Sequence, residues 1–146
     1  MKKELVLKSN KYLANINVNY VKLHNLHWNV LGLQFKPVHE YLEGLYDSMH
    51  EIFDEVAELL KMNGEYPLAS LKDFLAVSEI SELESKDYSV KESLQIALRD
   101  IKVLRENAVE LRKLAAEDEF YPLQVMMEDH LANYNKVVWF IESMLK

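Results

Sequence analysis

The sequence has 146 residues, with 24 acidic and 17 basic side chains and a formal net charge of −7. This length suits a single domain over residues 1–146. Cysteine is absent, which excludes disulfides and thiolate metal sites. No apolar run is long enough to cross a membrane, and no apolar stretch follows the first basic residues as in a signal peptide. We therefore expect a cytoplasmic protein with no membrane partner.

The first predicted helix covers about residues 4–31, where apolar positions recur at steps of three and four. Gly32 follows as a helix stop. A second helix is predicted from Pro37, a residue suited to a first helical turn, to about residue 63. The recurring positions of the first helix are Leu13, Ile16, Tyr20, Leu23 and His27.

Three further helices are expected, and no segment has the pattern of a strand. A short one covers residues 71–77, a long one residues 90–116, and a last one begins at Pro122. Four long helices with a long second connection predict an all-α, ferritin-like four-helix bundle with a short extra helix in that connection. The expected core positions are Leu94, Leu98, Ile101, Leu104, Ala108 and Leu111 in the third long helix, and Val125, Tyr134, Val138, Ile141 and Leu145 in the fourth.

The second long helix carries a stripe of side chains that can bind metals. The stripe has six His, Asp and Glu side chains. At about 100° per residue they fall within a narrow arc, whereas the apolar residues of the helix centre on another side. An ordinary solvated helix face would show a similar division. This stripe, however, contains no Lys or Arg and includes two histidines. Its members are His39, Glu43, Asp47, His50, Asp54 and Glu58.

The spacing within the stripe predicts a site shared by two chains. His39 and Glu43 are one turn apart, and so are Asp54 and Glu58. The two pairs are separated by about 16 Å along the helix axis, at 1.5 Å per residue, so one copy cannot surround one ion with both. An antiparallel second copy, paired by a two-fold axis near residues 48–49, would place each pair opposite the other and create two equivalent sites.

A further ligand is expected from the first helix, where His27 and His24 compete for the role. A lone histidine on an apolar face can equally be an ordinary core residue. Imidazole and carboxylate together suit iron, zinc or manganese. The di-iron site inside a ferritin bundle requires Glu-x-x-His motifs, which this sequence lacks; the nearest match, Asp47-x-x-His50, lies on the stripe. An intra-bundle di-iron site is therefore disfavoured.

The segment from Leu23 to Glu58 resembles the Dps proteins, or mini-ferritins. It begins L-H-N-L-H-W-N-V-L-G-L-Q-F-K-P-V-H-E-Y-L-E-G-L-Y-D and ends D-E-V-A-E. The resemblance rests on the His-Trp pair, Gly32, Phe35, His39 and the Asp-x-x-x-Glu spacing. It extends more loosely along the whole chain to Trp139.

This resemblance implies a ferroxidase centre between two-fold related subunits. His27, His39 and Glu43 would come from one subunit and Asp54 and Glu58 from the other, with Trp28 beside them. The metal would be iron, taken up as Fe2+ and oxidised to Fe3+, with up to two ions per site and zinc able to substitute. The family often has Asp where Glu43 stands.

The resemblance further implies a dodecameric homo-oligomer built from two-fold dimers, a hollow shell that stores ferric mineral. The small-molecule oxidant would be hydrogen peroxide or oxygen, and the role would be protection from oxidative stress. DNA binding is the alternative function. The only basic candidates near the N-terminus are Lys2, Lys3, Lys8 and Lys11, and an acidic body repels DNA, so we do not expect it. A helical scaffold without metal is the third alternative.

Two departures from the family pattern concern the surroundings of the site. Leu59 stands where relatives usually have Arg after the last ligand. The start of the last helix lacks the acidic spacing that lines iron-entry pores in relatives. Nearby substitutes, which an ordinary acidic turn would also explain, are Glu117, Asp118, Glu119, Glu128 and Asp129.

Overall fold

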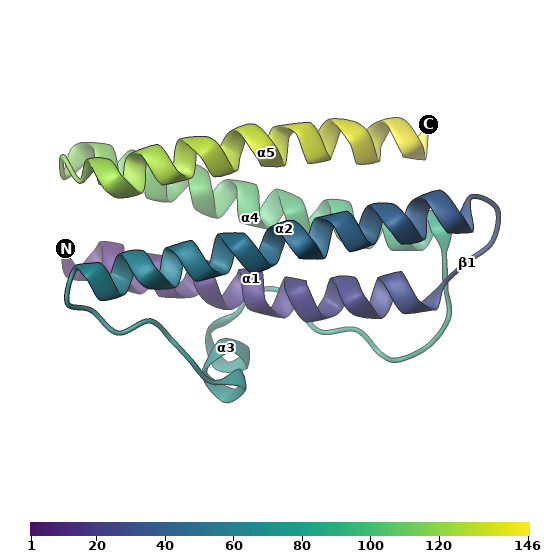
Figure 1. Ribbon diagram of the computed structural model, residues 1–146, viewed down its shortest axis with the longest axis horizontal. Coiled ribbons are helices and arrows are strands. Elements are labelled where there is room, and N and C mark those ends of the chain that lie inside the picture. Colours follow the sequence, from purple (N-terminus) through teal and green to yellow (C-terminus); the bar gives the residue numbers. More distant parts are fainter.

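The computed structural model describes all residues 1–146 and is built from helices (Figure 1). The helices are α1 (Lys3–Asn29), α2 (Phe35–Met62), α3 (Leu71–Val77), α4 (Val90–Glu117) and α5 (Tyr121–Leu145). Four long helices lie side by side, and the short α3 lies in the connection between α2 and α4. The predicted all-α four-helix bundle with an extra helix is confirmed, and α3 has the predicted bounds.

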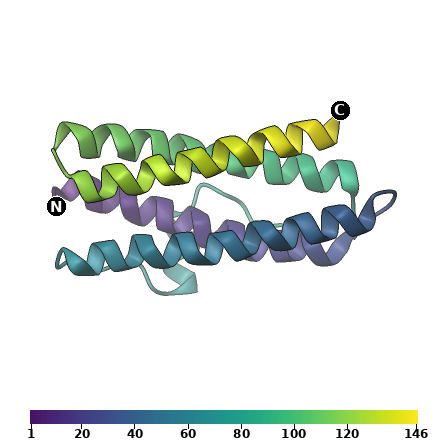
Figure 2. The ribbon, with the colours of Figure 1, turned by 45° about the horizontal axis from the view of Figure 1, so that its top comes forward.

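The long connection between α2 and α4 determines how the four long helices pair and in which direction each runs. Helices α1 and α2 pack as one antiparallel pair, and α4 and α5 pack as another (Figure 2). The chain from α2 to α4 runs back along the bundle past α3, so α2 and α4 point the same way (Figure 1). This is the crossover connection predicted from the spacing of the second and third long helices.

Two very short strands contradict the expectation that no strand is present. β1 (Val30–Leu31) and β2 (Tyr88–Ser89) pair in parallel, with Val30 opposite Tyr88. Each strand has only two residues, too few to produce an alternating pattern in the sequence. The pairing ties the end of α1 to the start of α4. There Ser89 accepts a hydrogen bond from the backbone N–H of Glu92 at 3.0 Å, and the Glu92 carboxylate accepts one from the N–H of Ser89 at 2.9 Å.

The turn between α1 and α2 starts the second helix two residues before Pro37. Gly32 has φ +115°, a backbone conformation that residues with a Cβ atom rarely adopt. Its carbonyl accepts a hydrogen bond from the N–H of Phe35 at 3.1 Å. The helix therefore begins at Phe35, and Pro37 falls inside its first turn, where no N–H partner is required.

One cluster of 30 buried residues fills the space between the four long helices. It contains the predicted stripe of α4, with Leu98 partly buried at its margin. Val125, expected in the core, is 56% exposed, because the buried face of α5 is aligned with Leu123 and Met127, on the opposite side of the helix. No helix combines the length and apolarity required to span a membrane.

Candidate metal centre

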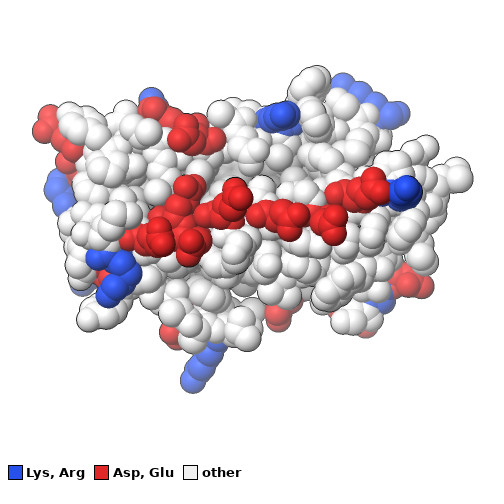
Figure 3. Space-filling model, in the orientation of Figure 1, with Lys and Arg blue, Asp and Glu red and all other residues white.

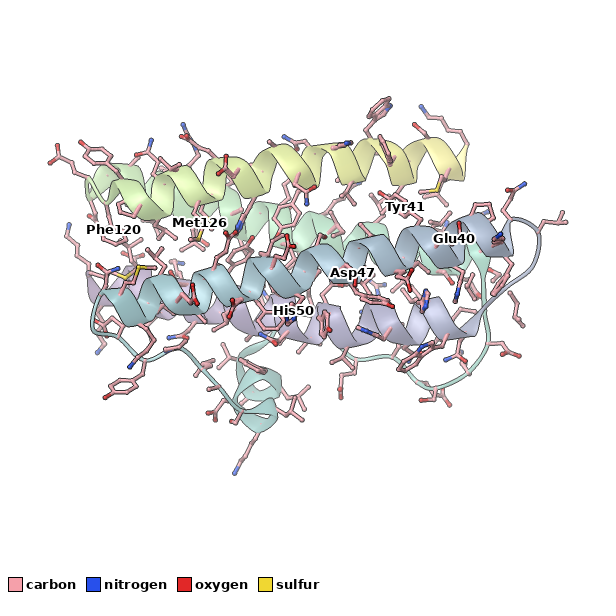
Figure 4. All side chains as sticks on the ribbon, viewed as in Figure 1. Glu40, Tyr41, Asp47, His50, Phe120 and Met126 are labelled. Carbon is pink, nitrogen blue, oxygen red and sulfur yellow. The ribbon has the colours of Figure 1, made fainter.

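The ligand stripe of α2 lies on the outside of the bundle, as predicted. Glu43, Asp47, His50, Asp54 and Glu58 are exposed, and His39 is half-buried. Acidic side chains form a red row along this face in Figure 3, with a basic side chain only near its ends. Asp47 and His50 lie on this side of α2 in Figure 4. The one ion pair within α2 joins Lys36 and Glu40 at 3.8 Å, so the stripe has no cation of its own helix beside it.

His27 and His39 form a reciprocal pair at one end of the stripe. Their rings stack with centroids 3.7 Å apart and planes 13° from parallel. Nδ1 of His27 donates to the carbonyl of His39 at 2.7 Å, and Nδ1 of His39 donates to the carbonyl of His27 at 2.6 Å. A carbonyl only accepts, so both protons are held on Nδ1. Each neutral ring keeps the lone pair of Nε2, the atom that can bind a metal.

The two histidines of α1 differ in their contacts. His27 is buried and locked against His39. His24 instead donates from Nδ1 to the carbonyl of Tyr20 at 2.7 Å, and its ring stacks on Tyr46 with centroids 3.7 Å apart. Both rings thus donate from Nδ1 to a backbone carbonyl, as metal-binding histidines commonly do. The difference is the neighbour: His27 lies against His39 of the ligand stripe, whereas His24 lies against Tyr46.

Tyr46 is a residue of this site that sequence reasoning missed. Its hydroxyl donates to the Glu43 carboxylate at 3.2 Å, and its ring lies between His24 and Glu43. Desolvation and the neighbouring Glu43 carboxylate raise the pKa of the Tyr46 phenol, which therefore stays a donor at neutral pH. The available signal was the three-residue spacing from Glu43, which puts both side chains on one helix face.

The two halves of the stripe do not meet within one chain. No three His, Asp or Glu side chains of the chain converge closely enough to hold an ion. His27 lies near the end of α1 and His39 and Glu43 in the first turns of α2, whereas Asp54 and Glu58 lie further along α2. Each chain thus presents two open half-sites on one exposed face.

The bundle core offers no competing acidic metal site. Lys22 of α1 and Asp100 of α4 form an ion pair at 2.7 Å, with side chains 1% and 5% exposed. Desolvation raises the pKa of the Asp100 carboxyl, and the Lys22 ammonium opposes that rise. A lysine ammonium in this position occupies the place that a bound cation would need.

Two of the acidic residues near the start of α5 have basic partners. Asp118 pairs with Lys2, and Glu128 accepts from Arg112 at 3.0 Å. These contacts favour an ordinary salt-bridged surface for Asp118 and Glu128. Leu59, which stands where relatives usually have Arg, is buried in the core cluster rather than placed at the metal centre.

Comparison with known proteins gives consistent results along the chain. A family model of the ferritin-like domain matches residues 8–146. Antigen TpF1 of Treponema pallidum is 35% identical over 93% of this chain and 77% of its own. Its crystal structure matches with a TM-score of 0.96 over 98% of this chain and 92% of the other.

Two Dps proteins are also similar. The DNA protection during starvation protein of Helicobacter pylori is 30% identical over 90% of this chain and 92% of its own. The second is the Dps protein from Vibrio cholerae O1, a member of a broad superfamily of ferritin-like diiron-carboxylate proteins. Its structure is 26% identical, with a TM-score of 0.94 over 99% of this chain and 90% of the other. The chain therefore belongs to the ferritin-like family and, within it, to the Dps proteins.

Proposed function

We propose that this protein is a ferroxidase and iron store that oxidises Fe(II) at sites between two-fold related subunits. The observation that carries the proposal is the reciprocal His27–His39 pair, which engages both Nδ1 atoms and leaves two Nε2 atoms available one helical turn before the exposed Glu43. Asp54 and Glu58 of a second subunit would complete the ligand set. The Vibrio cholerae relative belongs to a diiron-carboxylate superfamily, which supports iron as the metal.

The donor set fits iron as a substrate that enters, reacts and leaves. Two imidazoles and three carboxylates suit Fe(II), and zinc, which has similar ligand preferences, would compete for the same place. Five protein ligands shared by up to two ions leave coordination positions open for an oxidant, unlike a closed structural site. The carboxylates also favour the more highly charged Fe(III) product over Fe(II).

Hydrogen peroxide is the proposed oxidant, with oxygen as the alternative. Two Fe(II) ions each give one electron, the O–O bond breaks, and two protons from solvent complete two water molecules. Because both electrons arrive at one site, peroxide is reduced without release of hydroxyl radical. The Fe(III) then passes to a mineral stored inside a dodecameric shell, and this removal of iron and peroxide would protect a bacterial cytoplasm from oxidative stress.

The first test is oxidation of Fe(II) by hydrogen peroxide, followed by ferric absorbance, with the assembled protein and the Asp54→Ala, Glu58→Ala double variant. We expect the wild type to oxidise Fe(II) fast. The double variant should show only the rate at which Fe(II) is oxidised in buffer without protein. The control is Glu106→Ala with Glu142→Ala, which removes the same number of charges from exposed positions on α4 and α5. Equal rates in all three proteins would refute the proposal.

Mixed assemblies test whether the site is shared between subunits. The Asp54→Ala, Glu58→Ala subunit is co-refolded with an equal amount of a His39→Ala, Glu43→Ala subunit, each inactive alone. Half of the two-fold dimers would then be mixed, and each would hold one intact site, so about a quarter of the wild-type activity should return. A site formed within one subunit would give no recovery.

DNA protection is the second candidate function, because the Helicobacter pylori relative has that name. The net charge of −7 opposes phosphate binding. Three of the four N-terminal lysines are already paired: Lys2 with Asp118, Lys8 with Glu110 and Lys11 with Glu79. We expect no gel shift of duplex DNA at neutral pH and low salt. A shift that disappears as salt is raised would establish direct DNA binding.

A further inference from the structure

A chain of hydrogen bonds crosses the bundle core diagonally, outside the ligand stripe. Tyr134 of α5 and Tyr12 of α1 have hydroxyl oxygens 2.5 Å apart. The Tyr12 hydroxyl lies 2.8 Å from Nδ1 of His130, and Nε2 of His130 contacts the Glu55 carboxylate of α2. Both tyrosines are fully buried and His130 is 3% exposed, whereas the Glu55 side chain is 49% exposed.

The chemistry of the four groups allows only one donor-to-acceptor direction along these hydrogen bonds. A carboxylate oxygen accepts, so Nε2 of His130 carries the proton and Nδ1 is left as an acceptor. Tyr12 then donates to Nδ1, and Tyr134 donates to Tyr12. Desolvation lowers the pKa of His130 and raises the pKa of Tyr12 and Tyr134, so all three are neutral near pH 7 and this arrangement persists.

A buried phenol with an imidazole acceptor at hydrogen-bond distance is suited to lose one electron. An oxidised phenol is a strong acid, so its proton must leave with the electron, and in an apolar core it can go only to a group already in contact. Nδ1 of His130 is that group for Tyr12. The imidazolium that forms is held by the Glu55 carboxylate, a charge-assisted contact.

The hydrogen-bonded network ends beside the proposed metal centre. Glu55 follows Asp54 directly and is three residues before Glu58, so the network reaches the half of α2 that supplies the second subunit's ligands. No ligand of the proposed ferroxidase site belongs to the network. The network therefore connects two buried phenols to the segment of α2 that carries two of the proposed ligands, without containing a ligand itself.

We infer that Tyr12, with Tyr134 and His130, is a redox-active group that supplies a single electron when the site holds only one Fe(II). This inference rests on the proposed ferroxidase function. One Fe(II) and Tyr12 each give one electron to hydrogen peroxide, and the O–O bond breaks. Two protons from solvent complete two water molecules, and the phenolic proton of Tyr12 moves to Nδ1 of His130. The products are Fe(III), a Tyr12 phenoxyl radical and two waters, in place of a free hydroxyl radical.

Rapid freeze-quench electron paramagnetic resonance tests the inference. The assembled protein is loaded with less Fe(II) than it has sites and mixed with hydrogen peroxide. We expect a tyrosyl signal that narrows when tyrosine is ring-deuterated. The signal should be lost in Tyr12→Phe. In His130→Gln, where Tyr12 remains but its proton acceptor is gone, the signal should also be lost.

The control is Tyr41→Phe, which removes the hydroxyl of a partly buried tyrosine on α2 that lies outside the network. Tyr134→Phe is the second variant: it keeps the contact of Tyr12 with His130, so it should change the shape of the signal and not abolish it. Circular dichroism and size-exclusion chromatography establish that each variant is folded and assembled. An unchanged tyrosyl signal in folded Tyr12→Phe or His130→Gln would overturn the inference.

The outcomes separate this inference from the proposed function. If wild-type protein with excess Fe(II) does not accelerate oxidation, the ferroxidase proposal itself fails. If oxidation is fast but no tyrosyl signal depends on Tyr12 or His130, the ferroxidase proposal stands and the network only links α1, α2 and α5.

Discussion

The charged groups in the bundle core and those on the exposed stripe of α2 differ in whether they have partners within the chain. In the core, the ionisable groups have partners within the chain: Lys22 pairs with Asp100 at 2.7 Å, and both ring nitrogens of His130 are engaged. On the exposed stripe of α2, Asp54 and Glu58 have no basic partner, and Glu43 has only the Tyr46 hydroxyl. A buried charge without a partner is costly, whereas an exposed one is hydrated. Unpaired carboxylates are thus tolerated only where water, a cation or another subunit can reach them.

Breaking the buried ion pair should have the largest effect on stability. Lys22→Met leaves the buried Asp100 carboxyl with only the exposed Arg99 side chain, 3.8 Å away. Removal of one partner of a buried pair costs about 3–5 kcal/mol. Urea unfolding followed by circular dichroism measures this loss.

The double variant Lys22→Met, Asp100→Leu is the matched control. It removes both charges together, so most of the stability should return, because apolar side chains of similar volume can replace a buried pair. If the single and double variants are equally unstable, the loss comes from packing rather than from the unpaired charge.

Acid should destabilise the buried network through His130. Desolvation lowers the pKa of this imidazole below its ordinary 6.5, although Glu55 opposes the shift. The unfolded chain therefore binds more protons than the folded chain in this range, and stability falls as the pH decreases through and below 6.5. His130→Gln should show a flatter dependence of the urea midpoint on pH. Parallel curves for the two proteins would show that His130 does not contribute.

The smallest effect is expected on the surface of α2. Lys36 and Glu40 form an exposed pair at 3.8 Å, one turn apart. Lys36→Ala should change the free energy of unfolding by only about 0.5 kcal/mol, because solvent and salt screen such pairs. A loss as large as that of Lys22→Met would remove the contrast between the two regions.

Helical periodicity accounts for most of what could be predicted. Each long helix begins within two residues of its predicted start, and the first three end within two residues of their predicted ends, because apolar spacing and Gly or Pro punctuation are local properties. The failures were also local in origin. The β1–β2 pair is too short to leave a pattern, and Val125 is apolar but faces outward.

Side-chain partners were much harder to predict than elements. The sequence predicted His27 as the ligand but left His24 as its competitor, since both lie on α1 and either could turn toward α2. Only the packing of α1 on α2 brings His27 into reciprocal contact with His39 and directs His24 to Tyr46. The network of Tyr12, His130 and Tyr134 was not foreseen, because Tyr12 is more than a hundred residues away from the other two.

The sequence by itself determined the helices, the outward stripe of α2 and the separation of its two ligand pairs, because these follow from the repeat of a single helix. Tertiary structure decided which atoms meet: the Nδ1 contacts that leave Nε2 available on His27 and His39, the ion pair in the core and the diagonal hydrogen-bonded chain. The physical reason is that periodicity sets the direction of a side chain about its own helix axis. Its partner depends on how separate helices pack, and no local pattern contains that information.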